Sequence, residues 1–139
     1  MRVRIALAVA LGLWACYGDL HCYASEPTPT ITINGRWNGV ATVGIVPEGW
    51  RFDLTESTGG LVTGTVTMQA SQQTWSGTVN GRHSFPQVTL DLDFTGDGGM
   101  EAGVYNGHLE PTEDDSHTIR GELELGDDPV RTLNLVRGP

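Results

Sequence analysis

The amino-acid sequence predicts an all-β fold, an eight-stranded antiparallel up-and-down (meander) β-barrel that follows an N-terminal signal segment. Short runs of alternating apolar and polar residues recur at roughly 8–14-residue spacing, separated by Gly, Pro, Asp and Ser, which is typical of barrels and sandwiches. Behind the signal segment no stretch keeps the apolar period of a helix, so we expect no helix there. The connections are short, which favours antiparallel neighbours, and such a meander closes when its last strand pairs with its first.

The chain begins with a predicted secretion signal, residues 1–24. Two early arginines precede an apolar run, residues 5–15, that is too short to span a bilayer as a helix. Small residues within the segment 22–24 favour cleavage before Ser25. Cleavage at another position, for example after Gly18, stays open.

A lipoprotein signal is the alternative interpretation of the same segment. Residues 13–16 resemble a bacterial lipobox, in which Cys16 would be the lipidated residue and a lipid anchor. Either route exports the protein, so we expect it in the periplasm or outside the cell, membrane-anchored in the second case. Residues 25–34 are expected to form a linker, rich in Pro and Thr at its start, and residues 35–139 the barrel domain.

The charge of the chain excludes one class of partner. There are 17 acidic residues against 8 basic ones, and the formal net charge is −9. Such a surface repels nucleic acid and anionic lipid, so we expect no nucleic-acid partner. The strands direct Thr, Asp, Glu and Arg outward, where a membrane-spanning barrel needs an apolar band, so we do not expect the barrel to span a membrane.

The first four expected strands span residues 35–43, 50–56, 61–69 and 74–80. Each places its apolar residues on one face because side chains alternate along a strand. In chain order, the residues expected to face inward are Trp37; Trp50, Phe52 and Leu54; Val62, Gly64, Val66 and Met68; and Trp75, Gly77 and Val79.

The last four expected strands span residues 87–94, 102–110, 118–125 and 130–137. The strand at 87–94 has the cleanest alternation, with Thr and Asp on its outer face. In chain order, the inward residues are Val88, Leu90, Leu92 and Phe94; Gly103, Tyr105, Gly107 and Leu109; Ile119, Gly121, Leu123 and Leu125; and Leu133 and Leu135.

A short pattern, apolar-x-Gly-x-apolar, recurs in four of these strands. Its glycines are Gly64, Gly77, Gly107 and Gly121, each on the apolar face. A glycine inside a strand marks a bend or a close approach of backbones, and a narrow, strongly coiled barrel requires both. Slack in a flat sheet is the alternative interpretation.

The opening of the first strand and the end of the last one carry a resemblance. Gly35-x-Trp37, with Arg137 on the apolar face of the final strand, resembles the calycins, a superfamily of meander barrels that includes lipocalins, avidins and bacterial metalloprotease inhibitors. The resemblance implies that Trp37 plugs the closed end of the barrel and that Arg137 packs across it, with Arg131 as the second choice. The residues after Trp37 lack the polar set of the avidins, so biotin binding is not implied.

The meander also assigns a candidate ligand site. The start of the first strand and the end of the last lie at the closed end, so the opposite, open end is available for a ligand. The apolar residues expected to bind it are Trp50, Met68, Trp75, Phe94 and, deeper, Tyr105, within a rim of Glu48, Asp97, Asp127 and Asp128. An apolar pocket with a few polar groups is the usual small-molecule site, and an acidic rim favours a neutral or cationic ligand.

A filled core is the alternative, because eight strands enclose a space that side chains alone can fill. In that case we expect an interaction barrel that docks a protein through its loops or residues 25–30, as a secreted or periplasmic protease inhibitor does.

We predict no enzymatic activity, cofactor or metal. Residues 91–97 resemble a calcium loop in part, but Ala102 stands where the bidentate Glu should be. The acidic run 113–115 with His83 and His117 meets no metal-ligand spacing. No Ser, His and Asp fall into a recognisable nucleophile arrangement.

Overall fold

The computed structural model describes residues 30–94 and 100–139, and residues Ile31–Pro139 form one compact unit. The predicted signal segment, its possible cleavage sites, the anchor at Cys16 and the rim residue Asp97 lie outside the described residues. Among the residues described, no helix has the length and apolarity needed to cross a membrane.

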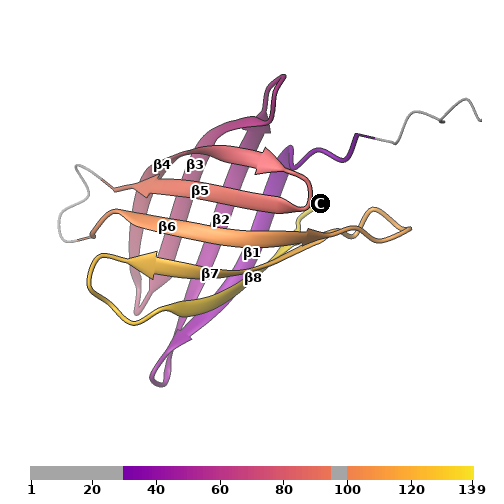
Figure 1. Ribbon diagram of the computed structural model, residues 1–139. Helices are drawn as coiled ribbons and strands as arrows, with labels where there is room; N and C mark the ends of the chain where they lie inside the picture. Colours follow the sequence, from indigo (N-terminus) through magenta and orange to yellow (C-terminus); the bar gives the residue numbers. More distant parts are fainter. Residues whose placement is uncertain (1–29, 95–99) are drawn as a thin grey trace, which may run out of the picture. The chain divides into compact units, whose positions relative to one another are not determined.

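The described chain is a closed barrel of eight antiparallel strands, each paired with its neighbour in sequence, and β8 pairs with β1 (Figure 1). This confirms the predicted fold class, and every element in the described ranges is a strand. The strands are β1 Gly35–Val43, β2 Val46–Glu56, β3 Leu61–Ala70, β4 Gln73–Ser84, β5 Gln87–Asp93, β6 Gly103–Glu110, β7 Thr118–Leu125 and β8 Arg131–Arg137.

Strand β2 begins four residues earlier than the sequence pattern predicts. Its start pairs with the end of β1, Val43 opposite Val46, across a two-residue turn in which Gly44 has a φ of 62°. Pro47 lies within this early part of β2, although proline cannot donate a hydrogen bond to a ladder. Its position tolerates proline, because the pairing of β2 with β3 begins only at Gly49 and residues 46–48 have β1 as their one neighbour there.

The glycines of the repeat lie where another backbone or ring comes close. A Cβ at Gly121 would lie 2.6 Å from Cζ of the Tyr105 ring, and one at Gly64 would collide with the carbonyl oxygen of Asp53. These contacts are the close approaches of a tightly coiled barrel, as the pattern predicted.

The compact unit begins at Ile31, ahead of the predicted domain boundary at Gly35. Ile33 is fully buried, and its carbonyl oxygen accepts a hydrogen bond of 2.8 Å from Nε1 of Trp37. Residues 31–34 therefore belong to the barrel, because Ile31 and Ile33 add apolar surface to its core.

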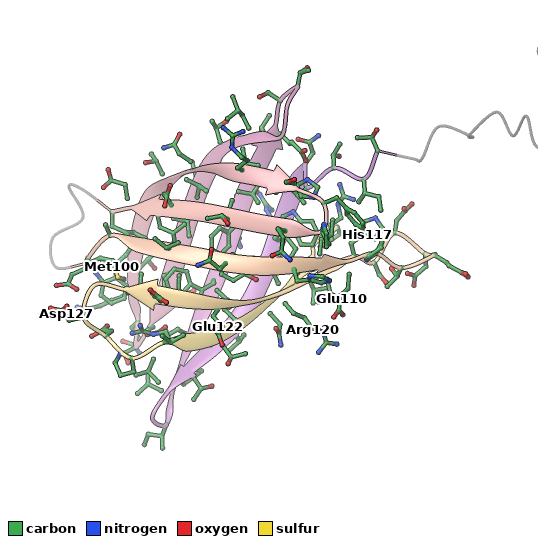
Figure 2. The ribbon with its side chains drawn as sticks, in the orientation of Figure 1. Met100, Glu110, His117, Arg120, Glu122 and Asp127 are labelled. Atoms are coloured by element: carbon green, nitrogen blue, oxygen red, sulfur yellow. The ribbon has the colours of Figure 1, made fainter. Side chains whose placement is uncertain are left out.

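The barrel has two distinct ends. At the closed end lie the start of β1, the end of β8 and the β2–β3, β4–β5 and β6–β7 connections. At the open end lie the β1–β2, β3–β4 and β7–β8 connections, the end of β5 and the start of β6. In Figure 2, Met100 and Asp127 lie at the open end, and Glu110 and His117 lie toward the closed end.

Candidate functional site

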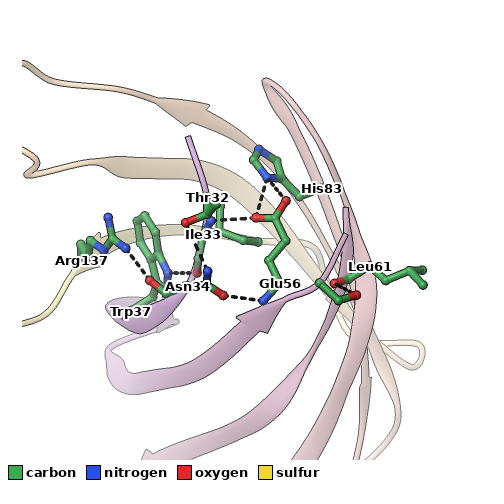
Figure 3. Close-up of polar contacts among 9 residues, drawn as sticks. Thr32, Ile33, Asn34, Trp37, Glu56, Leu61, His83 and Arg137 are labelled. Carbon is green, nitrogen blue, oxygen red and sulfur yellow. Dashed lines mark hydrogen bonds and ion pairs between the residues drawn. The ribbon is translucent and has the colours of Figure 1, made fainter. Parts of the chain in front are cut away.

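At the closed end, Arg137 covers Trp37. The two residues are partners in the β1–β8 ladder, and the guanidinium carbon of Arg137 lies 5.7 Å from the ring centroid of Trp37. Nη2 of Arg137 also donates a hydrogen bond of 2.5 Å to the carbonyl oxygen of Asn34 (Figure 3). The structure thus brings together the pair that the calycin resemblance singled out. The alternative prediction, that Arg131 makes this contact, is wrong. Arg131 is the first residue of β8 and lies at the open end.

A buried polar network fastens the N-terminal segment to the closed end (Figure 3). Nδ1 of His83 lies 3.0 Å and 3.1 Å from the two carboxylate oxygens of Glu56. The amide of Ile33 donates to the same carboxylate at 2.9 Å, and the amide of Glu56 donates to Oδ1 of Asn34. The network ties β2 and β4 to residues 33–34, so it has a structural role.

The two histidines that the sequence placed near an acidic run do not form a metal centre in the described part of the chain. His83 is paired with Glu56, and Nε2 of His117 lies 3.8 Å from Oδ1 of Asp115. Across residues 30–94 and 100–139, no three His, Cys, Asp or Glu side chains gather as metal ligands.

Three of the predicted ligand-binding residues form one aromatic layer inside the barrel. The ring of Trp50 lies 6.2 Å from that of Phe94, edge to face, and 6.2 Å from that of Phe52, stacked. Phe52 in turn lies 6.0 Å from Tyr105. The layer therefore runs from the open end into the middle of the barrel through Phe52, which the sequence assigned to the core alone.

Tyr105 lies deepest and has its polar atom satisfied. Its hydroxyl donates to the carbonyl oxygens of Leu133, at 2.9 Å, and Ile119, at 3.2 Å. Burial raises the pKa of Tyr105 well above its usual value, because the phenolate would lose its hydration. Tyr105 is thus a neutral core residue.

Met68 and Trp75 form the second group of predicted ligand contacts. They are ladder partners on β3 and β4, and Met68 also pairs with Trp50. Met68 is buried, whereas Trp75 and Met100 are half-buried and pack against the core. Half-buried apolar surface is thus present at the open end, above a filled interior.

A hollow of 670 Å³ lies on the outer wall of the barrel and is lined by residues of β4 to β7, among them Asn80, Asp91, Val104 and Glu124. The aromatic contacts inside the barrel favour the filled-core alternative over a deep internal cavity.

A buried ion pair lies beside the aromatic layer. Nε of Arg131 lies 3.1 Å from Oε2 of Glu48, and both side chains are under a tenth exposed. Nη2 of Arg131 donates to Oδ2 of Asp128 at 3.0 Å, and Nε1 of Trp50 donates to Oε2 of Glu48 at 3.3 Å. Nη1 of Arg131 is buried and has no hydrogen-bond partner among residues 30–94 and 100–139. We call Glu48, Trp50, Asp128 and Arg131 the open-end polar cluster.

The sequence interpretation missed this cluster, although one signal pointed to it. A strand that begins only at Trp50 leaves Glu48 in the preceding connection, which is why the sequence predicts it on the rim. Since β2 begins at Val46, alternation places Glu48 on the inward face with Trp50. Arg131 shares the parity of Leu133 and Leu135, so the alternation that predicts those two residues as inward also predicts Arg131 on the same face.

The tip of the β1–β2 hairpin extends beyond the other strands (Figure 1). Four apolar side chains of this hairpin are exposed, and Ile45 at the turn is 96% exposed. The four residues are Val40, Val43, Ile45 and Val46.

Comparisons with known proteins support the fold alone. No protein-family model matches the chain, and no curated protein matches it. The described architecture is similar to a solved de novo designed fluorescence-activating β-barrel, with a TM-score of 0.50 and 13% sequence identity over 76% of this chain and 93% of that one. The described chain therefore belongs to the class of closed eight-stranded antiparallel β-barrels.

Proposed function

We propose that the protein is an exported, non-enzymatic binding module that takes a small apolar or aromatic ligand at the open end of the barrel. The observation that carries the proposal is the buried Glu48–Arg131 pair beside the aromatic layer of Trp50 and Phe94. Apolar surface with a few converging polar groups is the usual composition of a small-molecule site.

The proposed site is shallow. Trp50, Phe94 and Tyr105 fill the interior, so the ligand lies above them and takes its contact area from the half-buried Trp75 and Met100. In this arrangement Trp50, Met68 and Phe94 form the floor of the site, and Tyr105 supports it from below.

The charges of the open end favour a neutral or cationic ligand. Two carboxylates, Glu48 and Asp128, surround the single guanidinium of Arg131. Glu101 and Asp127 add negative charge nearby, joined by a hydrogen bond of 3.3 Å from the Asp127 amide to the Glu101 carboxylate. An anionic ligand would be repelled by these groups.

We also propose that the barrel is calycin-like and that the N-terminal segment directs its export. The contact between Arg137 and Trp37 supports the first statement, because it is the contact that the resemblance implies. The positive start and short apolar run of residues 1–15 support the second.

Tryptophan fluorescence tests the ligand proposal. Neutral apolar dyes should change the emission of the intact protein, and Trp75→Ala should weaken their binding by about tenfold, since it removes most of the exposed contact area. The matched control is Phe85→Ala, which removes an exposed aromatic ring at the closed end. A panel of neutral, cationic and anionic dyes that leaves the emission unchanged would refute the proposal.

Docking of a protein is the second candidate function. The filled interior and the exposed apolar hairpin tip favour it, since an exposed apolar patch commonly marks an interaction site. A secreted or periplasmic protease inhibitor is one such protein. Titration of exported metalloproteases with the full chain and with its Ile45→Arg variant tests this: inhibition that the substitution abolishes supports docking through the tip, and full activity of all the proteases contradicts it.

A further inference from the structure

We infer that the open end selects a neutral ligand with a hydrogen-bond acceptor, such as the carbonyl oxygen of an aryl ketone or amide, and that Nη1 of Arg131 donates to it. This inference rests on the function proposed above and narrows its class of ligand. It starts from a nitrogen that has no hydrogen-bond partner in the part of the chain that the structure describes, on a side chain that is only 8% exposed.

The guanidinium of Arg131 has two of its three nitrogens next to carboxylates. Nη2 donates to Asp128, and Nε lies 3.1 Å from Glu48 without a well-directed hydrogen bond. Nη1 carries two further N–H groups, which are buried and reach no acceptor in the described chain. A buried donor without a partner is costly, so an acceptor that reaches Nη1 is strongly favoured.

The charge of the cluster decides which acceptor fits. Arg131 contributes one positive charge, and Glu48 and Asp128 contribute two negative charges. A carboxylate ligand would add a third negative charge next to the buried carboxylate of Glu48 and the partly exposed carboxylate of Asp128. A neutral carbonyl oxygen accepts from Nη1 without that repulsion, so the inference names a neutral acceptor.

The indole of Trp50 indicates which chemical group carries the acceptor of the ligand. Oε2 of Glu48 lies 3.1 Å from Nε of Arg131 and 3.3 Å from Nε1 of Trp50, so one carboxylate oxygen holds both side chains. A ligand whose oxygen reaches Arg131 therefore has its body against Trp50 and the aromatic layer. An aromatic ring next to the carbonyl suits that surface.

Because Nη1 is buried, a ligand reaches it only when the side chains above it move apart. The half-buried Trp75 and Met100 are among the apolar residues at the open end. We therefore expect slow association compared with an open surface site.

The test uses the full chain and a matched pair of naphthalene dyes. One is 6-propionyl-2-(dimethylamino)naphthalene, a neutral aryl ketone, and the other is its 6-propyl analogue, in which CH₂ replaces the carbonyl. We expect the ketone to bind about tenfold more tightly, and its carbonyl stretch to move to lower wavenumber when bound, as a donated hydrogen bond requires. A naphthalene carboxylate should bind more weakly than either.

Two outcomes separate the inference from the function on which it rests. Equal affinity for the two neutral dyes, with an unshifted carbonyl stretch, overturns the role of Arg131 and leaves the ligand site standing. Binding of neither neutral dye overturns both. The wild-type comparison needs no variant, so it is decisive even where substitution of Arg131 prevents folding.

Variants then assign the effect to one side chain. In Arg131→Met the ratio of the two dye affinities should fall to within about twofold, whatever the absolute affinity of either dye. Arg36→Met is the control, since Arg36 is half-exposed and paired with Asp53 on the outer wall. A ketone preference that survives in folded Arg131→Met contradicts the inference.

Discussion

Oε2 of Glu48 on β2 lies 3.1 Å from Nε of Arg131 on β8, and the two side chains are 9% and 8% exposed. The pair therefore joins two strands with β1 between them, at the end of the barrel where the pairing of β1 with β8 stops at Gly39 opposite Leu135. It is both a structural tie across the closing seam and the polar part of the proposed ligand site.

Removal of one member of this pair should cost more stability than removal of both. Arg131→Met leaves Glu48 buried without compensation, so we expect a loss of about 3–5 kcal/mol in the free energy of unfolding. The double variant Glu48→Leu/Arg131→Met should recover part of this loss. Chemical denaturation of the wild type, Arg131→Met, Glu48→Leu and the double variant measures the four unfolding free energies, and strict additivity of the two single losses would contradict the coupling.

Arg137→Met should destabilise the closed end. It removes the contact with the face of Trp37 and the hydrogen bond to Asn34, and together these contribute about 1–3 kcal/mol. The same substitution at Arg36, which is half-exposed and paired with Asp53, should cost under about 1 kcal/mol. Equal losses in denaturant unfolding would show that the Trp37–Arg137 contact has no special weight.

Glu56→Ala should release the N-terminal segment. The substitution leaves the amide of Ile33 and Nδ1 of His83 without their shared acceptor, at a cost of about 1–3 kcal/mol. Hydrogen exchange of the Ile33 amide should then speed up, while core amides respond less. Glu110→Ala is the control, because Glu110 pairs with Arg120 on the exposed surface. Unchanged exchange at Ile33 would contradict the role of this network.

The burial of Tyr105 predicts a loss of stability at high pH. Its pKa is raised in the folded state above the usual value of 10.0, so above that pH the unfolded chain releases a proton that the folded chain retains. The free energy of unfolding should therefore fall as the pH rises above about 10. Tyr105→Phe should remove this component of the slope and lose about 1–3 kcal/mol at neutral pH, since two carbonyl oxygens lose their donor. Denaturation across pH 8–11 compares the two slopes, and identical slopes would contradict the assignment.

The strands could be predicted because period-two alternation is a local property of the sequence. All eight strands overlap the ranges that the alternation predicts, and β1 and β7 agree in both bounds. Strand β4 was expected at 74–80 but continues to Ser84, so His83 lies in a strand. The start of β2 could not be predicted in this way, because Pro47 is compatible with a strand only where no third strand needs its amide.

The polar contacts were beyond a strand-by-strand interpretation. Glu56 and His83 meet because β2 and β4 both end at the closed end, and Ile33 reaches them only after the barrel has closed. Glu48 and Arg131 are 83 residues apart in the chain and meet across the seam. Alternation gives the face of each residue, whereas its partner depends on the shear of the closed barrel.

The most direct test of the proposed site is a titration of the ¹⁵N-labelled protein with the neutral ketone dye, followed by the indole N–H signals of its tryptophans. Nε1 of Trp50 donates to Glu48 within the open-end polar cluster, and Nε1 of Trp37 donates to Ile33 at the closed end. We predict that the signals of Trp50 and Trp75 shift with the dye while that of Trp37 stays in place. Unshifted Trp50 and Trp75 signals under saturating dye would contradict a ligand site at the open end.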